Sequence, residues 1–274
     1  MTTVLRSLLF VPGARPDRFD KAVAAGPDIV AIDLEDAVLQ NQKAEAREAV
    51  INYLNASSDT SKLCVRINGM STEHALADLS ALSASKAKPA LVMIPKVESV
   101  EEVQLAARLL AGVRLIALIE TPIGVLNAVN IAGTHKNLCG LMFGGADFSV
   151  AMGSDMSWDA LLHARGQLAL AAKIHGLDMI DVPYLDIQNE AGLRAETAAI
   201  KAMGFTGKAA IHPSQVAPIN AVFSPSEAEI ANARAIVEAY ENCGDGALLV
   251  NNKLVDEPVV VQARRTLEIA NQSS

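Results

Sequence analysis

Short apolar runs alternate with longer amphipathic stretches along most of the chain, and the alternation repeats eight times. The runs span residues 5–11, 29–34, 63–67, 91–94, 115–119, 138–143, 179–185 and 208–211. Between them, apolar residues recur at i, i+3, i+4 and i+7, which is typical of one face of a helix. Strand–helix alternation predicts right-handed βαβ units and a parallel sheet. Eight units favour a closed (β/α)8 barrel, the fold class known as the TIM barrel, over an open doubly wound sheet.

Polar residues collect where the predicted strands stop. The residues that end or follow the runs are Asp33, Glu35, Asp36, Arg66, Lys96, Glu120, Asp147, Asp186 and His212. In a (β/α)8 barrel the carboxyl ends of all strands open onto one face, where catalysis occurs. The pattern therefore predicts an active site on this face.

The composition agrees with a large α/β core. Of the 274 residues, 51% are hydrophobic but only 4% are aromatic, so Ala, Leu, Ile and Val must build the core. Strands buried on both faces have this composition. We expect residues 1–223 to form the barrel and residues 224–274 to form an extension. This extension would contain a helix, a hairpin turning at Asn251-Asn252 and a last helix from Pro258 to about Ala270, and would cover its own barrel or reach a neighbouring subunit.

Charge and cysteine content narrow the class of protein. A net charge of −8 argues against nucleic acid as a partner, because phosphate binding needs a basic surface. The first apolar run is too short for a signal peptide, and no stretch approaches the roughly 20 residues of a membrane span. Cys64, Cys139 and Cys243 show no metal-ligand spacing. These features predict a soluble cytoplasmic protein with reduced cysteines and no membrane partner.

Two carboxylates are candidates for a metal site. Glu120 and Asp147 follow the fifth and sixth runs, with Gly144-Gly145 just before Asp147. Oxygen ligands converging on one barrel mouth suit a hard cation such as Mg²⁺, which keeps several waters. Either acid alone could instead be a solvated loop residue or a helix N-cap.

Cationic residues lie at two further points. Arg66 follows the third run and is either an internal ion pair or a bidentate clamp for a substrate carboxylate. The segment from Phe10 to Lys21 includes Arg15 and opens a helix, whose N-terminus attracts anions. This segment indicates a phosphorylated ligand, or else carries ordinary surface cations.

The remaining polar residues have less specific readings. Glu35 and Asp36 either orient metal-bound waters or cap the next helix, and His212 could simply pack the end of the barrel. Lys96 is the only candidate for a Schiff base, but nearby acids would keep it protonated. No Ser/His/Asp triad or cysteine nucleophile is recognisable.

Eight motifs read together resemble a known family. They are RSLLFVPGARPDRFDKA, AIDLEDAV, VRIN, IPKVES, LIETPIGVLNA, FGGADFS, GKAAIHPSQV and KLVDEP, and they extend from residue 5 to about residue 265. The chain resembles the citrate lyase β-subunit-like branch of the HpcH/HpaI aldolase superfamily, which includes malyl-CoA and citramalyl-CoA lyases.

The resemblance implies a Mg²⁺-dependent barrel that assembles as a homotrimer or a hexamer. It assigns the metal to Glu120 and Asp147 and the substrate carboxylate to Arg66. It assigns the CoA moiety to Phe10, Arg15 and Lys21. It further makes Asp256, in Leu254-Val255-Asp256, an acid/base for the adjacent subunit. Many relatives have Gly-Ala-Glu-Asp where this chain has Gly145-Ala146-Asp147, so the acyl chain stays open.

The expected reaction cleaves a 3-hydroxy-3-carboxyacyl-CoA to acetyl-CoA and a 2-oxo acid. Citramalyl-CoA, giving pyruvate, is the leading substrate because small residues at 144–146 leave room near the metal; malyl-CoA, giving glyoxylate, follows. The alternatives are a class II aldolase on free 2-oxo acids, a citrate lyase β subunit that needs an acyl carrier, and a malyl-CoA thioesterase.

Overall fold

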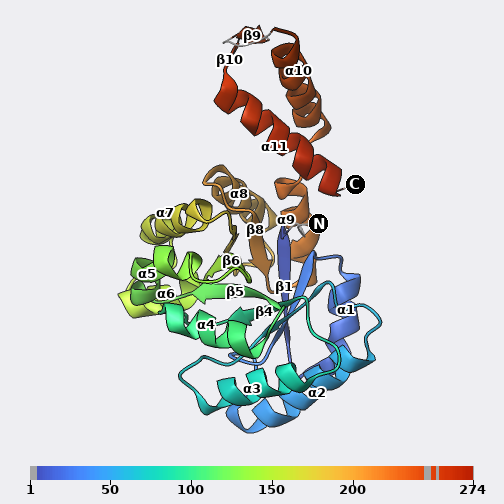
Figure 1. Ribbon diagram of the computed structural model, residues 1–274, viewed down its shortest axis with the longest axis vertical. Helices are drawn as coiled ribbons and strands as arrows, with labels where there is room; N and C mark the ends of the chain where they lie inside the picture. The colour runs from blue at the N-terminus through green and yellow to red at the C-terminus, as the bar shows by residue number, and fades with distance from the viewer. Residues whose placement is uncertain (1–4, 244–247, 251–252, 274) are drawn as a thin grey trace. The chain divides into compact units, whose positions relative to one another are not determined.

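Eight parallel strands form a closed barrel, as the apolar runs predicted. The computed structural model describes residues 5–243, 248–250 and 253–273. The strands pair in the order β1 to β8, and β8 returns to β1. They are β1 Ser7–Pro12, β2 Ile29–Asp33, β3 Leu63–Arg66, β4 Leu91–Ile94, β5 Arg114–Ile119, β6 Leu138–Phe143, β7 Asp178–Asp181 and β8 Gly207–Ala210. Helices surround this barrel (Figure 1).

The helices follow the strands in the predicted alternation. They are α1 Phe19–Ala24, α2 Lys43–Ala56, α3 Glu73–Ala84, α4 Val100–Leu109, α5 Pro122–Ala132, α6 Gly145–Met152, α7 Trp158–Ile174, α8 Glu190–Ala202, α9 Val216–Phe223, α10 Glu227–Cys243 and α11 Glu257–Ser273. Short 3-10 turns lie at Pro16–Arg18, Gln40–Gln42 and Pro213–Gln215. The capping box Ser99/Glu102 and the Thr121 side chain begin α4 and α5.

Small and branched apolar side chains fill the barrel, as the low aromatic content required. The central cluster consists of Leu5, Leu8, Ile29, Ala31, Cys64, Leu91, Met93, Ile116, Leu118, Met142, Ile180 and Ala209. β7 differs most from its apolar run, since it ends at Asp181 whereas the run continues to Leu185. Pro183 has no N–H to donate to a neighbouring strand, so the ladder cannot continue through it.

The strand register determines which polar residues meet. Asp33 pairs with Arg66 where β2 and β3 end, and Ile119 pairs with Phe143 where β5 and β6 end. Glu120 and Gly144 therefore leave adjacent strands at the same level. The carboxyl ends of these four strands thus place acids and a guanidinium on one face of the barrel.

The chain divides into two compact units: residues 5–219 form the barrel unit, and the described residues from Asn220 onward belong to the second unit. In the second unit α10 packs against α11. Leu248–Val250 and Lys253–Val255, β9 and β10, pair antiparallel as a hairpin should. The expected turn at Asn251-Asn252 lies outside the described residues. No helix that the structure describes is long and apolar enough to cross a membrane.

Candidate active site

A pocket of about 450 Å³ opens at the carboxyl ends of the barrel strands. Its polar lining comes from Asp33, Asp36, Arg66, Glu120 and Asp147, all of which lie in the barrel unit. Its apolar lining includes Phe10, Leu118, Met142, Val182, Pro183 and Ile211. The face that sequence analysis identified therefore carries a cavity with acids, one guanidinium and an apolar wall.

Glu120 is the most deeply buried acid of this pocket. It follows β5 directly and is 2% exposed. Its Oε1 accepts the backbone N–H of Lys96 at 2.8 Å, and its Oε2 lies against Gly144. A Cβ on Gly144 would lie 2.5 Å from the Cβ of Glu120, so only glycine leaves space for this carboxylate. Asp147 is half-buried in the first turn of α6.

The environment of Glu120 disfavours its negative charge. Burial, followed by the charges of Glu35 and Asp147, raises the pKa of Glu120 to about 8. The N–H of Lys96 and its ammonium oppose this shift without cancelling it. Without a further cation, this carboxyl group is therefore largely protonated at neutral pH.

Arg66 is the last residue of β3, and its guanidinium contacts Asp33 and Phe10. Its Nε and Nη2 donate to the two oxygens of Asp33 at 2.7 and 2.6 Å, a bidentate pair. Its guanidinium lies 5.0 Å from the ring centre of Phe10. Burial opposes the charge, but the hydrogen bonds and charge of Asp33 outweigh it and raise the pKa of Arg66. Arg66 thus carries a fixed positive charge in the pocket.

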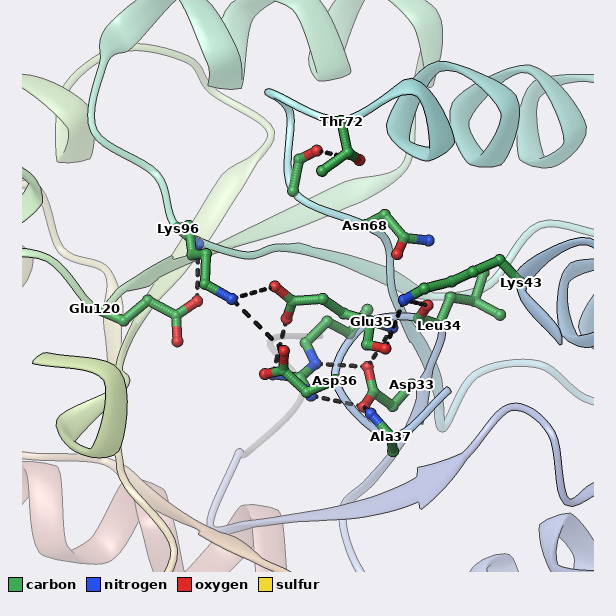
Figure 2. Close-up of polar contacts among 12 residues, drawn as sticks. Asp33, Leu34, Glu35, Asp36, Ala37, Lys43, Asn68, Thr72, Lys96 and Glu120 are labelled. Atoms are coloured by element: carbon green, nitrogen blue, oxygen red, sulfur yellow. Dashed lines mark hydrogen bonds and ion pairs between the residues drawn. The ribbon is translucent and has the colours of Figure 1, made fainter. Parts of the chain in front are cut away.

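Glu35 and Asp36 lie beside Lys96 (Figure 2), and both also form ion pairs with Arg66. Oε2 of Glu35 is 3.1 Å from Nη1 of Arg66, although no donor is aligned to hydrogen-bond it, and Oε1 is 2.6 Å from Nζ of Lys96. Asp36 lies at 3.5 and 3.6 Å from the same two cations. The ion pairs raise the pKa of Lys96 despite its partial burial, the direction expected from the nearby acids.

Negative charge exceeds positive charge at this mouth. The acids are Asp33, Glu35, Asp36, Glu120 and Asp147, and the neighbouring cations are Lys43, Arg66 and Lys96. Five carboxyl groups against three cations leave a difference of two charges when Glu120 is ionised and of one when it is protonated. Among the described residues no three His, Cys, Asp or Glu side chains gather as a metal cluster. Mg²⁺ commonly uses one or two carboxylates and completes its shell with water and substrate, so Glu120 and Asp147 fit it.

The segment from Phe10 to Lys21 contributes to the pocket only through Phe10, Val11 and Pro12, which end β1. Arg15 is exposed and pairs with Asp17 through two contacts of 2.8 and 2.7 Å. Lys21 is exposed on α1. Phe10 is thus brought to the pocket, whereas Arg15 and Lys21 do not line it.

Three more predicted positions are not among the residues that line the pocket. Asp256, in the second unit, begins α11, and its carboxylate accepts the N–H of Val259 at 3.4 Å. His212 caps the 3-10 turn after β8, and Asp186 accepts the N–H of Gln188 within a loop. The last two are explained locally by these capping contacts.

Sequence reasoning gave no role to two residues that shape the site. Asp33 holds Arg66 and also accepts the N–H groups of Glu35 and Ala37 at 2.8 and 2.9 Å. The ammonium of the buried Lys43 donates to the carbonyls of Leu34 and Glu35. The ends of the second and third runs placed both residues on one face of the barrel, but their pairing depends on the register of β2 and β3. Nothing in the spacing indicated Lys43.

A (β/α)8 barrel whose strand ends form a pocket of acids and a paired arginine has the architecture of a barrel enzyme. The family model described as HpcH/HpaI aldolase/citrate lyase matches residues 6–213, and one described as C–C bond lyase of the TIM-barrel fold matches residues 158–272. The chain belongs to the HpcH/HpaI aldolase/citrate lyase family, and it is an enzyme.

Known relatives support this placement over nearly the whole chain. The (3S)-malyl-CoA thioesterase of Cereibacter sphaeroides is 39% identical over 268 residues, which cover 96% of this chain and 93% of that protein. Human mitochondrial citramalyl-CoA lyase is 34% identical over 289 residues, covering 97% and 85%. Protein CitE from Mycobacterium tuberculosis, solved with magnesium, acetoacetate and coenzyme A, has a TM-score of 0.85 and 34% identity, covering 97% and 98%.

Proposed function

We propose that this enzyme is a Mg²⁺-dependent lyase that cleaves citramalyl-CoA or malyl-CoA to acetyl-CoA and pyruvate or glyoxylate. One observation carries the proposal: the pocket places Glu120 and Asp147 together with Arg66, so that a cation and a substrate carboxylate can bind side by side. The CitE structure with magnesium and coenzyme A and the human citramalyl-CoA lyase support the choice of cofactor and substrate class.

In this proposal Glu120 and Asp147 hold the metal. The excess of acids at the mouth and the raised pKa of Glu120 both call for a cation. When bound, Mg²⁺ supplies a Lewis acid for the oxygen that becomes the oxo-acid carbonyl. Arg66 binds the substrate carboxylate, and Asp33 fixes the plane of its guanidinium.

The bond that breaks joins the carbinol carbon to the carbon next to the thioester. The hydroxyl proton leaves to water that Glu35 and Asp36 orient at the mouth. The electron pair of the broken bond moves to the acetyl carbon, and Asp256 of a neighbouring subunit gives that carbon a proton. This arrangement requires a homo-oligomer, which the family resemblance makes a trimer or a hexamer, and gives the extension of residues 224–274 its role.

In this proposal, the segment from Phe10 to Lys21 binds CoA. Phe10 lines the pocket, and exposed Arg15 and Lys21 follow it within one turn and a short helix. In the proposal, these cations meet the phosphates of CoA outside the pocket while the acyl end enters it. Arg15 then exchanges its exposed partner Asp17 for a phosphate.

Thioester hydrolysis is the second candidate, because the Cereibacter sphaeroides relative is a malyl-CoA thioesterase. A lyase releases acetyl-CoA and an oxo acid, whereas a thioesterase releases free CoA and the intact hydroxy acid. A citrate lyase β subunit would instead need an acyl carrier, and an aldolase would act on free oxo acids.

A panel of hydroxyacyl-CoA thioesters incubated with the purified chain and Mg²⁺ separates these functions. The proposal expects acetyl-CoA and oxo acid in equal amounts from citramalyl-CoA or malyl-CoA. Free CoA with intact hydroxy acid would establish hydrolysis. No product from any CoA thioester, with turnover of a carrier-bound or free substrate, would reject the proposal. The cytoplasmic location stays a prediction; the human relative is mitochondrial.

A further inference from the structure

Lys96 has an unusual backbone at the edge of the proposed metal site. It lies two residues after β4 with φ +52°, and among the described residues it is the only non-glycine with positive φ. Side chains of L-residues rarely adopt this left-handed conformation, because the Cβ approaches the following carbonyl. Strain of this kind persists only where the surrounding structure enforces it, and it clusters at functional sites.

The left-handed backbone gives Glu120 its hydrogen-bond donor. The N–H of Lys96 donates to Oε1 of Glu120 at 2.8 Å, while the next N–H, of Val97, donates to the carbonyl of Leu118 at 3.1 Å. Two successive backbone N–H groups therefore hydrogen-bond to the end of β5. The first donates to the side chain of Glu120, and the second donates to the backbone carbonyl of Leu118. Oε2 of Glu120 stays on the side of Gly144, which lines the pocket.

The side chain of Lys96 forms ion pairs with acids that follow β2. Its Nζ lies 2.6 Å from Oε1 of Glu35 and 3.6 Å from Oδ1 of Asp36 (Figure 2). Glu35 is itself 7% exposed and anchored by Arg66. These ion pairs, together with the buried neighbours Pro95 and Val97, hold the strained conformation in place.

We propose that Lys96 is a positioning residue: its left-handed backbone fixes Oε1 of Glu120 so that Oε2 faces the metal, and its ammonium locks that conformation. The inference rests on the proposed function in one respect, the role of Glu120 as a metal ligand. Lys96 acts through Glu120 and needs no contact with substrate. If the left-handed conformation of Lys96 had no role in the site, the affinity for Mg²⁺ would not depend on which residue occupies position 96.

The test measures Mg²⁺ affinity of the substrate-free protein by calorimetry for a charge-matched pair, Lys96→Gly and Lys96→Val. Both variants lose the ammonium, so its repulsion of the metal cancels in the comparison. Glycine adopts positive φ freely, whereas a β-branched residue resists it most. Lys96→Arg keeps the cation, and Lys86→Val makes the same change at an exposed loop position. Glu120→Gln measures how far the affinity depends on the ligand itself.

We expect Lys96→Val to bind Mg²⁺ about tenfold to a hundredfold more weakly than Lys96→Gly, the range for losing a hydrogen bond to a charged group. Lys96→Arg and Lys86→Val should stay within about threefold of the parent. If Lys96→Val is too unstable to purify, Lys96→Met replaces it, since it too is strained at positive φ.

The outcomes separate the two claims. Equal affinities of the valine (or methionine) and glycine variants, with binding abolished in Glu120→Gln, overturn the role of Lys96 and leave the metal site standing. An unchanged affinity in Glu120→Gln, or no Mg²⁺ binding by the parent protein, rejects the proposed metal site itself. A melting temperature measured for each variant shows whether a lost affinity accompanies a lost fold.

Discussion

Replacing Arg66 by lysine keeps the positive charge but removes the planar fork of donors. In the structure, two of these donors already bind Asp33, and the third nitrogen faces Glu35 and the pocket. A lysine ammonium cannot hold Asp33 in two parallel bonds and also present an aligned donor to a substrate carboxylate. It also loses the stacking of the guanidinium on Phe10.

The size of the effect follows from the bonds lost. A hydrogen bond to a charged group contributes about 1.5–3 kcal/mol. Loss of one such bond to the substrate, with Asp33 no longer fixing the orientation, should remove about 2.7 kcal/mol of transition-state stabilisation. The expected fall in kcat/KM is therefore at least about 100-fold. Stability should fall as well, because the buried carboxylate of Asp33 keeps only part of its pairing.

Arg6 offers a matched control at the opposite end of the barrel. Just before β1, it forms its own bidentate pair with Asp28, at 2.9 and 2.8 Å, in which the two side chains are 18% and 14% exposed, against 12% and 2% for Arg66 and Asp33. Arg6→Lys should lower the melting temperature as Arg66→Lys does, by a smaller amount because its partner is less buried. Its kcat/KM for the CoA thioester should stay within about threefold of the parent. A loss under about threefold for Arg66→Lys would mean that Arg66 is only an internal ion pair.

Three further changes test the rest of the site. Glu120→Gln or Asp147→Asn should abolish activity through loss of Mg²⁺ while circular dichroism stays unchanged; full activity of either variant, or of the parent in excess chelator, contradicts this. Charge reversal at Arg15 and Lys21 together should raise KM for the CoA substrate more than it lowers kcat, and an unchanged KM places CoA elsewhere. Asp256→Asn should bind metal and substrate but lose proton exchange at the acetyl carbon. Mixing it with Glu120→Gln under subunit exchange should restore part of the activity, and a dead mixture despite mixed oligomers argues against action in trans.

The fold could be predicted because its signal is local and repeated. Each strand is a short apolar run and each helix has its own amphipathic period, so eight units could be counted without knowledge of any contact. The end of β7 was less readable, because mostly apolar residues continue past Asp181 to Leu185 while the strand ends at Asp181. An apolar sequence indicates that residues are buried, not that they belong to a strand. Here buried and half-buried residues continue after β7 because Pro183 stops the hydrogen bonding between strands without ending the burial.

The candidate site was only partly readable for a physical reason. Barrel topology brings every strand end to one face, so Glu120, Asp147 and Arg66 could be grouped from their positions alone. The partner of Arg66 depended on the register between β2 and β3, which no local pattern encodes. The left-handed backbone of Lys96 has no sequence signal either, because lysine shows no preference for positive φ.

The central claim is that the pocket breaks a carbon–carbon bond with the help of a metal. The most direct measurement follows ¹³C-labelled citramalyl-CoA by NMR with the parent protein, with Mg²⁺ and with excess chelator. The account predicts labelled pyruvate and acetyl-CoA appearing together in equal amounts with Mg²⁺, and neither product with chelator. Labelled citramalate with free CoA, or cleavage that continues at full rate in chelator, would contradict it.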